Sequence, residues 1–230
     1  MNILALDTSM GVCSAAVLQV LPSARKQVLR EAEMTRGHAE ALMPMVEEVL
    51  AEARVQPHDL STIAATQGPG SFTGVRVAIA AARGLALTCD ATLFGTDSLT
   101  VMARRALVEG LSPDGPFAIA VDARRGMVYF GLFSADGSRL EGPRLCSPGE
   151  AAADLPSDLM LAIGSGARFL IEAAGGRDRM LTATMFDLQA GAMALSVLAA
   201  ESTERLPILR PLYLRPPDAK PQKAAVDHQP

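Results

Sequence analysis

ILALDTSMGVCSAAVL at residues 3–18 has a counterpart later in the chain, AIAVDARRGMVYFGLF at residues 118–133. The two stretches align without a gap, so that Asp7 matches Asp122 and Gly11 matches Gly126. Each is an apolar, β-rich run that ends in an acidic residue, followed by a short polar turn with a glycine and a second β-rich run. This order is typical of a β-hairpin. A repeat of this size predicts that the chain is built from two related halves.

The residues after each hairpin extend the parallel between the halves. A third β-rich run follows both hairpins, and in the first half the apolar residues from His38 to Ala53 then recur at helical spacing. A glycine-rich loop at residues 68–74 separates a strand-like run from an apolar helix. The remaining predicted strands lie at 27–32, 62–66, 91–94, 139–146 and 160–163, and the remaining helices at 75–87, 98–107, 167–174 and 188–202.

Two β-β-β-α-β-α halves describe an α/β protein with a duplicated ribonuclease-H-like, or actin-like (ASKHA), fold whose two lobes face a cleft. We place the first lobe at residues 1–110 and the second at 111–215, because the segment 111–116 is rich in Pro and Gly and lies between periodic elements. The last helix could pack back on the first lobe. Residues 216–230 lack periodicity and are predicted to be a disordered tail.

Composition narrows the functional classes. The 230 residues include 21 Lys+Arg and 25 Asp+Glu, and a net charge of -4 disfavours a protein that binds nucleic acid on its own. Three well separated cysteines fit neither a disulfide framework nor a paired zinc site. The first residues lack the basic region of a signal peptide, and no uninterrupted apolar run is long enough to span a bilayer. We therefore expect a soluble, cytoplasmic protein.

Four short runs carry a specific resemblance, together with Gly37-His38 ahead of the first helix. They are LALDTS at 4–9, GPGSFTGVR at 68–76, DARRG at 122–126 and PLYLR at 211–215. These runs resemble the TsaB (YeaZ) family, the bacterial subunit that dimerises with the enzyme TsaD in threonylcarbamoylation of the adenosine next to the anticodon of tRNA. One departure is Met127, which stands where family members usually carry an acid.

The resemblance implies an actin-like fold and a role as the smaller, non-catalytic partner of TsaD. It also implies the ATPase TsaE as a further partner, and contact with tRNA through the complex. A homodimer is expected when TsaD is absent, because paralogues present similar surfaces. No membrane is implied.

A catalytic metal in this superfamily needs two histidines one helical turn apart. His38 has Leu42 at that spacing, and His58 and His228 are isolated from it. We therefore predict no metal, no catalytic residue and no cofactor in this chain alone, with ATP or ADP in the complex as the weaker alternative.

The glycine-rich loop and the two acids permit two interpretations each. The loop could be a vestigial phosphate cradle at a helix N-terminus, or its glycines could only allow a tight turn, with Ser71 or Thr73 capping the helix. Asp7 and Asp122 stand where an actin-like ATPase holds the metal of its nucleotide, yet Arg124 and Arg125 favour a salt bridge across the cleft instead. The candidate cleft residues are Asp7, Gly68, Gly70, Ser71, Thr73, Gly74, Arg76 and Asp122.

The helix after the loop suggests a contact surface. Small residues recur every four positions at Gly74, Ala78 and Ala82, which gives the helix a flat edge for another helix or for its own sheet. We expect an exposed strip on the first two helices to bind TsaD, or a second copy of the chain, through Met43, Val46, Val75, Ala78, Ile79 and Ala82.

Two other functions compete with the role of a binding subunit. The first is a stand-alone actin-like ATPase or kinase that uses Asp7, Asp122 and the loop at 68–74. The second is a metal-dependent glycoprotease of the M22 type, which the missing histidine pair disfavours.

Overall fold

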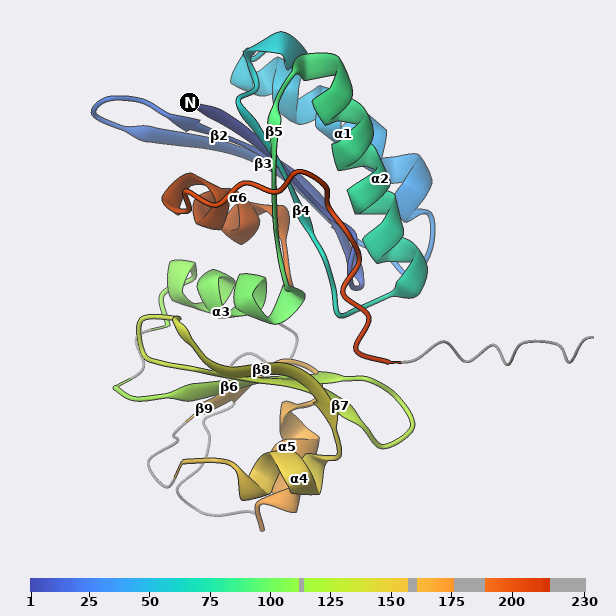
Figure 1. Cartoon of the computed structure of the whole chain (residues 1–230), viewed down its shortest axis with the longest axis vertical. Helices are drawn as coiled ribbons and strands as arrows, with labels where there is room; N and C mark the ends of the chain where they lie inside the picture. The colour runs from blue at the N-terminus through green and yellow to red at the C-terminus, as the bar shows by residue number, and fades with distance from the viewer. Residues whose placement is uncertain (112–113, 157–160, 176–188, 216–230) are drawn as a thin grey trace, which may run out of the picture.

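The computed structural model describes residues 1–111, 114–156, 161–175 and 189–215. They form two β-sheets, and Figure 1 shows α3 and α6 lying between them. The boundary expected at 111–116 falls between α3 and β6, although residues 112–113 lie outside the described residues. The expected tail at 216–230 also lies outside them.

The first sheet has five strands in the order β3-β2-β1-β4-β5. Its central strand β1 pairs antiparallel with β2 and parallel with β4, which places the acid-ended strand in the middle of the sheet. The helices α1 and α2 cover one face of it (Figure 1). The elements are β1 (Asn2–Asp7), β2 (Val12–Val20), β3 (Arg25–Glu33), α1 (His38–Ala53), η1 (Pro57–Asp59), β4 (Thr62–Thr66), α2 (Phe72–Cys89) and β5 (Thr92–Thr96).

The second sheet has four strands in the order β8-β7-β6-β9 and repeats this topology. Strand β6 pairs antiparallel with β7 and parallel with β9, as β1 does with β2 and β4. Asp122 ends β6 as Asp7 ends β1, so the predicted duplicated ribonuclease-H-like fold is confirmed. Helix α3 (Ser98–Val108) precedes the boundary, and the elements after it are β6 (Phe117–Asp122), β7 (Val128–Phe133), β8 (Arg139–Cys146), α4 (Pro148–Ala153), β9 (Leu161–Ile163) and α5 (Ala167–Ala173).

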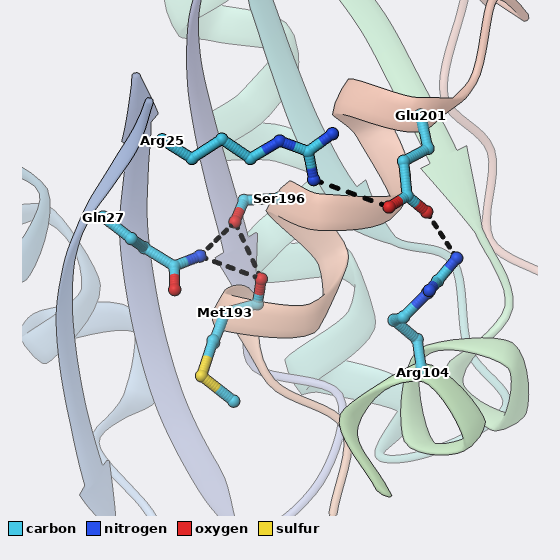
Figure 2. Close-up of polar contacts among 6 residues, drawn as sticks. All are labelled: Arg25, Gln27, Arg104, Met193, Ser196 and Glu201. Atoms are coloured by element: carbon cyan, nitrogen blue, oxygen red, sulfur yellow. Dashed lines mark hydrogen bonds and ion pairs between the residues drawn. The ribbon is translucent and has the colours of Figure 1, made fainter. Parts of the chain in front are cut away.

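The last helix, α6 (Ala192–Glu201), packs on the first sheet, against β1, β2 and β4, and also contacts α3. It is apolar on every side, as a helix surrounded by other elements must be. Its polar groups are held from two directions (Figure 2). Gln27 of β3 donates to the Ser196 hydroxyl at 2.6 Å, and Glu201 pairs with both Arg25 of β3 and Arg104 of α3.

Several observed boundaries differ from the predicted ones. Helix α2 begins at Phe72 because Ser71 caps it, accepting the Gly74 N–H. Helix α4 was not predicted at all, although Ser147 and Glu150 form a capping box that marks its start. Part of the helix predicted at 188–202 is α6, but residue 188 lies outside the described residues.

The packing of α6 gives a stability prediction. Leu195 is fully buried between the first sheet and α3, so Leu195→Ala should lower the free energy of unfolding by about 2 to 5 kcal/mol. Leu140 on β8 is 57% exposed, and Leu140→Ala should change it by about 0.5 kcal/mol or less. Urea denaturation of both variants measures the difference. Similar small losses would show that α6 does not complete the core.

Candidate functional site

A cavity of about 520 Å³ lies where the ends of β1 and β6 face each other. The first sheet contributes Ser9, Gly70 and Ser71 to its wall, and the second contributes Asp122 and Arg124. A smaller hollow of about 300 Å³ shares Asp122 and Arg124 with it. The two acid-ended hairpins therefore face a common cleft, as the fold class implies.

Asp7 is buried beneath this cleft and does not line the cavity. One carboxylate oxygen accepts the Thr66 hydroxyl at 2.6 Å and the other accepts the Ser9 N–H at 2.7 Å. Burial raises the pKa of Asp7 above its ordinary value of 3.8, and the bonds from Thr66 and Ser9 oppose that rise. Both oxygens thus serve the chain itself, joining β1 to β4 and fixing the turn after β1.

Asp122 is half-buried and does line the cavity. Its Oδ1 accepts the Arg124 N–H at 2.8 Å, which shapes the turn between β6 and β7. The contact that crosses the cleft comes from Arg215, whose guanidinium donates to the Ala123 carbonyl at 2.8 Å. Arg215 ends the PLYLR run at residues 211–215, but the sequence pattern indicates no role for it. Its role could not be predicted, because it depends on the path of the chain after α6.

The glycines of the 68–74 loop allow a close contact between backbones. A Cβ at Gly70 would lie 2.1 Å from the Ser9 carbonyl oxygen, and one at Gly74 would lie 1.9 Å from that of Thr8. The Ser71 N–H donates to the Ser9 oxygen at 2.7 Å. The geometry therefore favours the tight-turn interpretation, because this amide is already used within the chain.

Three further candidate cleft residues lie apart from the cavity wall. Gly68 has a φ of 92°, in the left-handed region, and Thr73 is exposed at the start of α2. Arg76 stacks on Phe72, with 3.6 Å between its guanidinium carbon and the ring centre, and donates to the Tyr213 hydroxyl at 2.7 Å. Arg76 thus belongs to the rim formed by α2 and the segment after α6.

The strip expected to be exposed on α1 and α2 is mostly buried. Met43 is 39% exposed, but the other five side chains pack into the core of the first lobe, so that expectation is wrong for Val46, Val75, Ala78, Ile79 and Ala82. The flat edge of α2 faces its own sheet. Its opposite face exposes Phe72, Ala80, Gly84 and Leu87, together with Arg76 and Arg83.

His38 also has a structural contact, since its Nε2 lies 3.1 Å from the Met10 carbonyl oxygen. Within the described residues, no group of three or more His, Cys, Asp or Glu side chains is placed to hold a metal ion. By length and composition α2 is long and apolar enough to cross a membrane, but core helices can have the same length and composition. One face of α2 packs on the first sheet, as the face of a core helix does.

The two glycines of α2 give a matched pair of variants. Gly74→Ala should destabilise the protein by about 1 to 3 kcal/mol, because the added methyl group meets backbone that cannot turn away. At Gly84 an added Cβ meets no atom within 4 Å, so Gly84→Ala should stabilise the helix by up to about 1 kcal/mol. Urea denaturation tests both. Equal effects would contradict the proposed close contact.

Asp7 gives a prediction about pH. Its folded-state pKa is raised, so the stability that the protonated carboxyl contributes is complete below pH 3.8 and is lost as the pH rises through the folded-state pKa. Asp7→Asn keeps the shape of the side chain without the buried charge. The stability of this variant relative to the wild type should therefore increase as the pH rises through the folded-state pKa of Asp7. Denaturation of both proteins between about pH 4 and pH 8 measures this. A pH-independent difference would contradict it.

Comparisons with known proteins agree with this architecture. The family model of TsaD, tRNA N6-adenosine threonylcarbamoyltransferase, matches residues 31–173. The tRNA threonylcarbamoyladenosine biosynthesis protein TsaB of Haemophilus influenzae is 30% identical over 94% of this chain and 94% of its own length. TsaB of Escherichia coli is 34% identical over 59% of this chain and 56% of its own.

A solved structure extends the similarity to three dimensions. YeaZ from Pseudomonas aeruginosa superposes with a TM-score of 0.77 at 28% identity, covering 93% of this chain and 99% of that one. The similarity therefore includes both sheets and is not restricted to the dense motifs of the first half. The chain belongs to the TsaB (YeaZ) family.

Proposed function

We propose that this chain is a non-catalytic subunit of the tRNA threonylcarbamoyladenosine modification complex, in which it binds and supports TsaD. The supporting observation is that, in this relative of TsaD, polar groups at the cleft that a nucleotide or its metal would need are bonded to other parts of the same chain. Both oxygens of Asp7 accept hydrogen bonds from neighbouring residues, and the loop at 68–74 is pressed against the turn after β1. The chemistry then belongs to the partner.

The contact with TsaD is proposed on the outer face, which we define as the exposed Ala80, Gly84 and Leu87 of α2 together with Met43 of α1. Leu87 is 87% exposed, and the small residues Ala80 and Gly84 leave the helix surface beside it flat. Small and apolar residues here allow close approach of a partner helix and many dispersion contacts, and the exposed Arg83 beside them adds a positive charge. A stable pair would bury on the order of 1,600 Å² in total.

The remaining partners follow from the same proposal. The outer face would also support a homodimer without TsaD, because a two-fold contact needs only self-complementarity. TsaE and tRNA would join through the complex, in the cytoplasm. No resident cofactor is proposed for this chain, and ATP or ADP in the assembled complex is the weaker alternative.

The pairing test uses size exclusion with light scattering on the chain mixed with its cognate TsaD. A 1:1 complex is expected. Gly84→Arg should reduce its affinity at least tenfold while leaving the monomer folded, because the new side chain projects from an exposed position and separates the helices. Leu140→Glu, on the second lobe, is the control and should pair normally. Unchanged pairing by Gly84→Arg would exclude the outer face.

The catalytic question needs a separate measurement. The purified chain alone should neither transfer threonylcarbamoyl groups to tRNA nor hydrolyse ATP at the median enzymatic rate of roughly ten per second. Adding the chain to TsaD and its substrates should increase modification. Turnover by the chain alone, abolished by Asp7→Asn, would instead favour the stand-alone ATPase or kinase.

A further inference from the structure

Ten of the sixteen arginines among the described residues belong to two sets with different surroundings. Six of them form ion pairs with nearby carboxylates: Arg25, Arg30, Arg104, Arg105, Arg139 and Arg144. Four others gather around the mouth of the cleft and have no ion-pair partner among the described residues. We call Arg76, Arg124, Arg168 and Arg215 the arginine patch.

A series of contacts connects the four side chains. Arg215 donates to the Ala123 carbonyl and lines the 520 Å³ cavity together with Arg124. Arg124 also lines the smaller hollow, whose wall includes Phe169, and the Arg168 guanidinium carbon lies 4.7 Å from the centre of that ring. On the other side of the mouth, Arg76 holds Tyr213, two residues before Arg215. Both lobes therefore contribute to one surface.

The arginine patch is locally basic in a protein whose net charge is -4. Among the described residues that line the two hollows, Asp122 is the one acidic side chain. Arg124 and its neighbour Arg125 also hold left-handed backbone conformations, with φ of 63° and 56°. Each such non-glycine residue costs roughly 1 to 2 kcal/mol. Exposed strain of this kind is typical of functional surfaces.

We infer that the arginine patch binds the phosphate backbone of RNA. Guanidinium groups bind phosphate in a bidentate manner, and several of them spread over one surface match a chain of phosphates better than a single anion. Phe72 and Tyr213, which are 59% and 51% exposed beside Arg76, add aromatic faces on which unpaired bases can stack. The choice of RNA over an acidic protein rests on the proposed function and on these aromatics.

The test measures fluorescence anisotropy of a labelled anticodon stem-loop RNA, with the TsaD complex if one forms and with the chain alone otherwise. The variant Arg124→Gln/Arg168→Gln removes two patch charges, and neither side chain makes a hydrogen bond or ion pair to a described residue. Affinity at about 50 mM KCl should fall about tenfold or more. The slope of log K against log salt should fall by about two.

The matched control is Lys26→Gln/Arg54→Gln, which removes the same charge from exposed sites on β3 and after the end of α1, outside both the arginine patch and the outer face. It should change RNA affinity less than about twofold. Equal losses in both double variants, or no RNA binding by the wild type at about 50 mM KCl, would overturn the inference. Weakened pairing of the patch variant with TsaD, at unchanged RNA affinity, would assign the patch to protein contact and also overturn it. Size exclusion on the same samples measures pairing and so tests the proposed function separately.

Discussion

The contact between the start of α2 and the turn after β1 leaves no room for side chains, and the rest of the first lobe depends on it. Gly70 and Gly74 bring two backbones together there, and the Thr8 hydroxyl donates to the Gly74 carbonyl at 2.6 Å. The same contact turns the small-residue edge of α2 toward the sheet. In this contact the Ser71 N–H, which could otherwise donate to a phosphate, donates to the Ser9 carbonyl oxygen. One steric requirement thus accounts for the orientation of the helix and for the internal contacts at the edge of the cleft.

The two lobes are joined by elements that belong to neither sheet. Helix α6 packs on the first sheet and α3, with Glu201 paired to both sides. The segment after α6 then follows β5, where the Leu206 N–H donates to the Leu93 carbonyl, and reaches the second hairpin through Arg215. The opening of the cleft is therefore set by residues near the end of the described chain.

The sequence predicted the fold well because each half contains the same local pattern, a buried strand that ends in an acid and is followed by a hairpin. It could not say which side of α2 faces the sheet, since Ala78 and Ala82 suit a partner helix and a close strand equally well. Burial settles this in favour of the sheet. The arrangement of Arg76, Arg124 and Arg215 was also out of reach, because these residues meet only after both lobes and the final segment are placed.

The position of α6 has a consequence for synthesis on the ribosome. One face of the first sheet is covered by residues made about 95 positions after β5, so the first lobe emerges with that apolar face open. At typical translation speeds the delay is roughly 5 to 20 s. Throughout that interval the nascent chain presents a ready site for chaperones, and the first lobe completes its core only when the last helix arrives.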